Sequence, residues 1–160
     1  MARALVLGVG NILMQDEGIG VRALEWLQAH YVLPEVEMID GGTMGLDLLH
    51  YLEGVDHLLI LDAVEAGKAP GDITVLTDDD VPALLSMKIS PHQIGVQDLL
   101  ATAQLMGYIP PEVVILGVQP AQLSVGLEMS PGVTAQVEPL AHLALSQLEK
   151  WGYQTEKIQV

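Results

Sequence analysis

The chain has 160 residues, about the size of one domain, and half of them are apolar, so it can bury an aliphatic core. Six basic residues against 21 acidic ones give a net charge of −15, which argues against a general nucleic-acid binder and against docking on anionic membranes. Cysteine is absent, which excludes disulfides, cysteine zinc sites, iron–sulfur clusters and a cysteine nucleophile.

Five apolar runs of strand length follow one another along the chain. The runs at 4–9, 58–61 and 113–118 are continuously apolar, which is typical of strands buried on both faces of a parallel sheet. The run at 36–39 alternates apolar residues with Glu and predicts a shorter strand. The run at 73–76 predicts a further strand near an edge of the sheet.

Apolar residues at helical spacing predict helices between these strands. The first covers about 19–31, and the others span 46–52, 95–106 and 134–151. The three aspartates at 78–80 have the form of a helix start, because carboxylates favour the positive end of the helix dipole.

Strands that alternate with helices predict an α/β fold. We expect a three-layer α/β/α sandwich around a mostly parallel, twisted sheet of about five strands. No linker, repeat or low-complexity tract divides the sequence, so we expect residues 1–160 to form a single domain with a frayed tail at 153–160. There is no signal-peptide pattern and no apolar window of 18 residues, which predicts a soluble, cytoplasmic protein with no membrane insertion.

Carboxylates follow each of the first three strong strands. Asp16 and Glu17 come soon after the first strand, Asp40 after the second and Asp62 after the third. If these strands are parallel, the carboxylates meet at one edge of the sheet, where ligands bind in such folds. Clustered carboxylates repel one another unless a cation, a donor or a proton compensates. A divalent cation would do so, and His92, in a later proline-interrupted loop, could supply a nitrogen ligand.

A structural reading of these residues stays open. An aspartate in the turn after a strand commonly accepts hydrogen bonds from local amides, and Asp16 could cap the helix that follows it. The other histidines fall on expected helices or at a strand start and are expected to be structural or solvated: His30, His50, His57 and His142.

Two other chemistries are disfavoured by the motifs. Gly8-Val9-Gly10 resembles the start of a dinucleotide fingerprint, but Leu13 stands where the third glycine belongs, and no Walker-type phosphate loop is present. There is no nucleophile elbow, and Ser90 beside His92 is a weak candidate because their proximity is only sequential. We therefore expect no nucleotide cofactor.

The candidate residues lie within longer segments: GVGNIL and DEGIGV (8–13 and 16–21), DGGT (40–43), LDA (61–63) and KISPHQ (88–93), with weaker similarity at GVQP (117–120). Together these segments resemble the hydrogenase maturation endopeptidases, nickel-dependent proteases that process the large subunits of [NiFe]-hydrogenases. Any one segment would be weak, but the combination is specific.

The resemblance implies an endopeptidase that recognises nickel in the precursor of a [NiFe]-hydrogenase large subunit and then removes its short C-terminal peptide. It implies metal contacts from Glu17, Asp62 and His92. It also implies that Asp40 is a conformational or substrate-contacting residue rather than a ligand, which completes the expected catalytic set. The implied peptidase mechanism is metal-dependent, of aspartic type or outside the established classes.

Two carboxylates and an imidazole form a site compatible with nickel or zinc. The metal could polarise the scissile carbonyl, activate water or only anchor the substrate. We favour anchoring, because a protease with its own tightly bound metal could not sense nickel in its substrate. Nickel is therefore expected to come from the precursor, and the site is expected to be weak or empty in the isolated protein.

Three alternatives stay open. A nickel carrier or chaperone could use the same carboxylates without hydrolysis. A small-molecule hydrolase or nucleotide enzyme could have a similar sheet, but it would need a phosphate-binding loop or a nucleophile elbow, and the sequence has neither. A structural or interaction domain would use every acid in turns or caps. A large protein substrate also predicts exposed apolar surface beside the site, with candidates at Met14-Gln15 and at 83–89.

Overall fold

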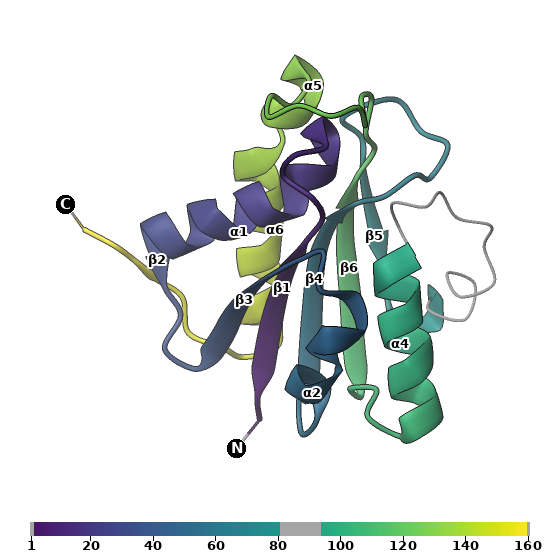
Figure 1. Ribbon diagram of the computed structural model, residues 1–160. Helices are drawn as coiled ribbons and strands as arrows, with labels where there is room; N and C mark the ends of the chain where they lie inside the picture. Colours follow the sequence, from purple (N-terminus) through teal and green to yellow (C-terminus); the bar gives the residue numbers. More distant parts are fainter. Residues whose placement is uncertain (1, 81–93, 160) are drawn as a thin grey trace.

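The computed structural model describes residues 2–80 and 94–159 and contains a five-stranded sheet between two layers of helices (Figure 1). The strand order is β3-β1-β4-β6-β5, and only β5 runs antiparallel to its neighbour. The strands are β1 (Ala4–Val9), β3 (Val36–Gly42), β4 (His57–Ala63), β5 (Ile73–Leu76) and β6 (Glu112–Val118). The predicted α/β/α sandwich with a mostly parallel sheet is confirmed, and β5 lies at the predicted edge.

Alternating side chains of β1 divide the core into two aliphatic clusters. Val6 packs with α1 (Ile19–His30) and α6 (Val137–Lys150) on one face, whereas Leu7 packs with α4 (Ile94–Met106) on the other. Side chains of successive strand residues point to opposite faces, so a continuously apolar strand must be covered on both. This explains why the predicted buried strands have helices on either side (Figure 1).

The chain changes direction across the sheet between β1 and β4. From β1 it passes through α1 to β3 on one side, and then crosses back to β4 on the other side of β1. The carboxyl ends of β1 and β4 therefore flank a topological switch point, which is where open α/β sheets bind ligands.

Two predicted helices are interrupted in the structure. The one expected at 46–52 consists of a 3-10 turn, η2 (Gly45–Leu48), followed by α2 (Leu49–Leu52). The closing helix begins at Val137, after the separate short helix α5 (Pro131–Thr134). Pro139 has no N–H to continue a helical ladder back to Ala135, and so it falls in the first turn of α6, where none is needed.

The aspartates at 78–80 form a 3-10 turn, η3 (Asp78–Asp80), in which Asp80 accepts hydrogen bonds from the backbone and hydroxyl of Thr77. The helix that they were expected to begin lies outside the described residues.

The C-terminal segment, expected to be frayed, is attached to the domain. A short strand, β7 (Glu156–Lys157), pairs antiparallel with β2 (Tyr31–Val32). Tyr153 is buried, and its hydroxyl lies 2.6 Å from Nδ1 of His57. The prediction failed because it rested on local polarity, which carries no information about a partner strand more than 100 residues away. In the part of the chain that the structure describes, no helix is long and apolar enough to cross a bilayer.

Helix α1 packs tightly against the sheet at Gly20. A Cβ atom placed there would lie 2.0 Å from the carbonyl oxygen of Leu61 and 2.8 Å from that of Val9. Only glycine permits this contact, which brings the start of α1 against the carboxyl ends of β4 and β1.

We expect Gly20→Ala to lower the free energy of unfolding by about 3 kcal/mol, because the added methyl group overlaps backbone that cannot move independently. Gly132→Ala is the matched helical control, since the nearest atom to its Cβ would be 3.9 Å away. Urea unfolding of both variants tests this, and equal stability of the two would contradict it.

Candidate functional site

Glu17 lies in the loop between β1 and α1, within the 3-10 turn η1 (Gln15–Gly18). The loop turns sharply at Gly10, whose φ of 120° and lack of a Cβ let the backbone of Glu17 pass close to it. The Glu17 side chain is buried, and its Oε1 accepts a hydrogen bond of 3.1 Å from the backbone N–H of Asn11. The carboxylate is therefore held over the end of β1.

Asp62 is the second-last residue of β4 and is buried. Its Oδ1 accepts a 2.8 Å hydrogen bond from the backbone N–H of Ala63. Burial raises the pKa of Asp62 well above its ordinary value, the negative charge of Glu17 raises it further, and the Ala63 hydrogen bond opposes both. Two carboxyl groups from separate elements are therefore close enough at the switch point for the charge of one to affect the other.

Asp40 shares the carboxyl edge but lies on the other side of β1. It pairs in register with Gly8, and its side chain is exposed. It lines a cleft of about 290 Å³ together with Asn11, Leu13 and Thr43. The structure therefore does not place Asp40 with the Glu17–Asp62 pair, which agrees with a substrate-contacting role better than with a ligand role.

His92, the third expected ligand, lies outside the described residues. Within 2–80 and 94–159, no three His, Asp or Glu side chains are arranged to hold a metal ion. The Glu17–Asp62 pair offers oxygen donors of the kind that divalent cations accept, and a nitrogen from His92 would make the set suitable for nickel. The metal-binding and catalytic roles of these residues remain predictions.

Asp16 does not cap helix α1. It has no exposed surface and accepts hydrogen bonds of 2.7–2.8 Å from the backbone N–H groups of Ala121, Gln122 and Ser130 and from the Ser130 hydroxyl. Burial alone would raise the pKa of Asp16, but these hydrogen bonds lower it below its ordinary value. Asp16 therefore fastens the loop that carries Glu17 to the segment 121–130.

Gln119 is a structural residue of the site that the sequence analysis missed. It is buried at the end of β6, and its Oε1 accepts hydrogen bonds from the backbone N–H groups of Ala66 (2.8 Å) and Lys68 (3.1 Å). It thereby fixes the loop that follows Asp62. A glutamine directly after an apolar strand was the available signal, since a buried amide at a strand end needs partners.

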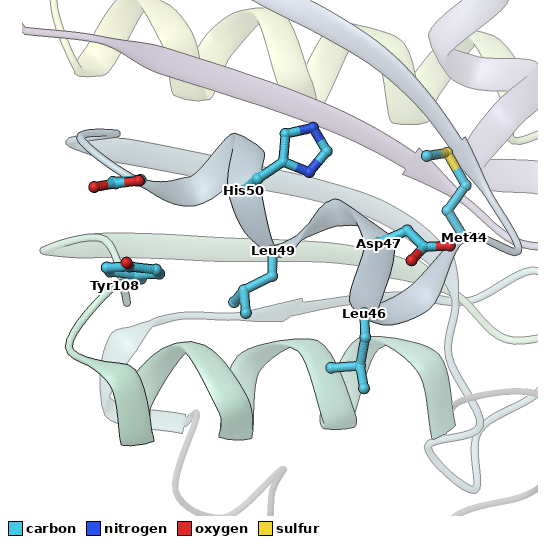
Figure 2. Close-up of a pocket in the computed structure, with 7 residues that line it drawn as sticks. Met44, Leu46, Asp47, Leu49, His50 and Tyr108 are labelled. Atoms are coloured by element: carbon cyan, nitrogen blue, oxygen red, sulfur yellow. The ribbon is translucent and has the colours of Figure 1, made fainter.

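A larger groove than the Asp40 cleft lies elsewhere, between η2–α2 and the end of α4 (Figure 2). Its volume is about 670 Å³, and Figure 2 shows Leu46 and Leu49 on the side toward α4. Its ionisable residues Asp47, His50 and Glu53 are exposed. This groove contains no buried pair of charged side chains, so the carboxyl edge remains the candidate site.

The four histidines outside the expected metal site lie on the elements predicted for them. They are His30 in α1, His50 in α2, His142 in α6 and His57 at the start of β4.

Comparison with known proteins gives one consistent result. A family model described as hydrogenase maturation protease matches residues 21–147. The Hydrogenase 2 maturation protease of Escherichia coli K12 is 45% identical over 94% of this chain and 93% of its own length. The hydrogenase expression/formation protein HupD of Rhodobacter capsulatus is 44% identical over 97% of this chain and 75% of its own.

Solved structures agree with the sequence relatives. The hydrogenase maturating endopeptidase HybD from E. coli superposes with a TM-score of 0.90 at 43% identity and covers 97% of both chains. A [NiFe] hydrogenase maturation protease HybD from Thermococcus kodakarensis gives a TM-score of 0.75 at 26% identity over 91% of this chain and 98% of that one.

We expect Asp62→Asn to raise the free energy of unfolding by at least about 1 kcal/mol at neutral pH. Because the pKa of Asp62 is higher in the folded than in the unfolded protein, the protonated carboxyl group stabilises the fold, and this contribution is complete below pH of about 4. That contribution is lost as the pH rises through the raised pKa. The advantage of the neutral amide should therefore grow with pH, as measured by urea unfolding between pH 4 and pH 8. A constant or absent advantage would contradict the assignment.

Asp16→Asn is a control for which we expect a change in stability of the opposite sign. The lowered pKa of Asp16 means that its ionised form stabilises the fold above pH of about 4 and that this contribution disappears as the pH falls. The side-chain NH2 group of the new asparagine cannot accept hydrogen bonds from the backbone N–H groups that Asp16 binds. The variant should therefore be less stable at pH 7 by about 2–4 kcal/mol.

Proposed function

The chain belongs to the hydrogenase maturation protease family, and on that basis we propose that it is the endopeptidase that removes a short C-terminal peptide from the precursor of a [NiFe]-hydrogenase large subunit. It is a peptidase by family, and the names of relatives that match nearly its whole length support a hydrogenase as the protein on which it acts. We further propose that it acts on precursor that already contains nickel, in the cytoplasm.

The juxtaposition of Glu17 and Asp62 is the observation that carries the proposal. Burial raises the pKa of Asp62, and the negative charge of Glu17 raises it further, so the free protein pays for ionising both carboxylates through burial and mutual repulsion. A cation entering between them would relieve this repulsion. A nickel ion presented by the substrate, with His92 as a further ligand, would therefore be attracted to the place where the substrate must be held.

In this proposal, the nickel of the precursor anchors the C-terminal segment at Glu17, Asp62 and His92. The segment then continues along the carboxyl edge toward the cleft lined by Asp40 and Asn11. Hydrolysis forms a bond between the water oxygen and the scissile carbonyl carbon and breaks the C–N bond. The new carboxyl group keeps the water oxygen, and a proton passes to the leaving amine. Anchoring contributes by fixing the scissile bond beside the site residues.

We expect Glu17→Gln, Asp62→Asn and His92→Ala each to abolish processing of nickel-loaded precursor, because each removes one anchoring contact. Mass spectrometry of precursor incubated with each variant measures the loss of the C-terminal peptide. Asp47→Asn and Glu53→Gln, which change exposed carboxylates of the separate groove, should process normally. Full processing by all three site variants would reject the residue assignment. Nickel transfer by the unaltered chain without a shortened product would reject the protease function in favour of a carrier.

We also expect the isolated chain to bind nickel weakly, with a dissociation constant well above its own micromolar concentration in equilibrium dialysis. The physical reason is that an enzyme already saturated with metal could not distinguish loaded from unloaded precursor. Tight stoichiometric binding without substrate would overturn the anchoring mechanism, while leaving peptide removal to be measured independently.

A further inference from the structure

Three large apolar side chains protrude from the carboxyl edge of the sheet, next to the candidate site. The exposed fractions are 55% for Leu13, 84% for Val125 and 65% for Leu127. Leu13 belongs to the loop before Glu17, and the other two belong to the segment between β6 and α5. We call these three residues the apolar rim.

Backbone hydrogen bonds join the two loops that carry the apolar rim. Gly126 donates to the carbonyl of Leu13 at 2.8 Å, and Gln15 donates to the carbonyl of Gly126 at 3.0 Å. Met14 and Gly126 form a parallel bridge. Because Gly126 stands between Val125 and Leu127, the three apolar residues lie on one continuous pair of loops.

Asp16 fixes this pair of loops to the domain. Its buried carboxylate accepts hydrogen bonds from Ala121, Gln122 and Ser130, which lie on both sides of the apolar rim in sequence. These hydrogen bonds fix the backbone of both loops, and the side chains of the rim stay exposed. Apolar side chains kept exposed in this way are typical of a protein-binding surface.

The apolar rim is continuous with the candidate site. Leu13 also lines the cleft that contains Asp40 and Asn11, and Glu17 follows it by four residues. Figure 1 shows the two loops at the same end of the sheet as α5, and the hydrogen bonds through Gly126 place them beside each other. A protein whose terminal segment enters the site would have to pass over this rim.

We infer that the apolar rim is a docking surface for the folded body of the hydrogenase large-subunit precursor, which would contact it through an apolar patch beside its C-terminal segment. This inference rests on the proposed function. Charge favours a different protein over a second copy of this chain, because two chains of net charge −15 repel each other. The rim thereby adds affinity for the substrate that is independent of nickel.

The test is the steady-state processing of nickel-loaded precursor by the double variant Val125→Ser/Leu127→Ser. We expect KM to rise about tenfold or more while kcat at saturating precursor is retained, because docking residues away from the scissile bond act on binding. Leu105→Ser is the matched control, since Leu105 is 88% exposed but lies near the end of α4 and should leave KM unchanged. When the double substitution is added to the Asp62→Asn variant, the affinity for precursor should fall by the same factor by which KM rises.

A rescue variant separates apolar contact from folding. Val125→Ile/Leu127→Met preserves the apolar surface and should keep KM near that of the unaltered chain, and thermal unfolding should show that all variants are folded. Unchanged KM in a folded serine variant would overturn the docking surface while leaving the protease function intact. Absence of cleavage by the unaltered chain would overturn both. A dimer that is lost in the serine variant, with processing unaffected, would assign the rim to self-association instead.

Discussion

The burial of two neighbouring carboxyl groups, those of Glu17 and Asp62, is the constraint around which the carboxyl edge is built. Burial and the neighbouring charge both raise the pKa of Asp62, so the free protein holds this pair at a cost in stability. The backbone nevertheless brings them together, because Gly10 and Gly20 let the loop and helix α1 close down on the ends of β1 and β4. The two aliphatic clusters on either side of the sheet supply the stability that keeps this arrangement in place.

Asp16 and Asp62 show how differently two buried aspartates can be used. Asp16 accepts four hydrogen bonds, its pKa falls, and it fastens two loops together. Asp62 accepts one described hydrogen bond, and its burial, together with the nearby charge of Glu17, raises its pKa. A buried charge satisfied by donors stabilises a structure, whereas one left facing a like charge is available for an incoming cation. This contrast distinguishes the structural acid from the candidate functional acid.

The sequence predicted the sheet, its edge strand and the meeting of Glu17 with Asp62, because these follow from apolar periodicity and from the parallel direction of the strands. It did not predict the partners of Asp16, which lie more than 100 residues away and, apart from the Ser130 hydroxyl, are backbone N–H groups that carry no residue-type signal. The separation of Asp40 from the pair also required coordinates, since it depends on β1 lying between β3 and β4. Of the apolar rim, the sequence indicated only the part next to Leu13, through the exposed surface expected at Met14-Gln15. It did not indicate Val125 and Leu127, because residues 121–130 form no regular element.

The pairing of β7 with β2 has a practical consequence for the position of the chain ends. Tyr153 contacts His57, the first residue of β4, and β7 lies beside the end of α1, so this segment belongs to the amino edge of the sheet. The described N-terminal residues lead into β1 from the same edge (Figure 1). A fluorophore attached beside β7 or beside the start of β1 would therefore sit at the edge opposite the one that carries Glu17, which leaves the carboxyl edge open to a bulky macromolecular substrate.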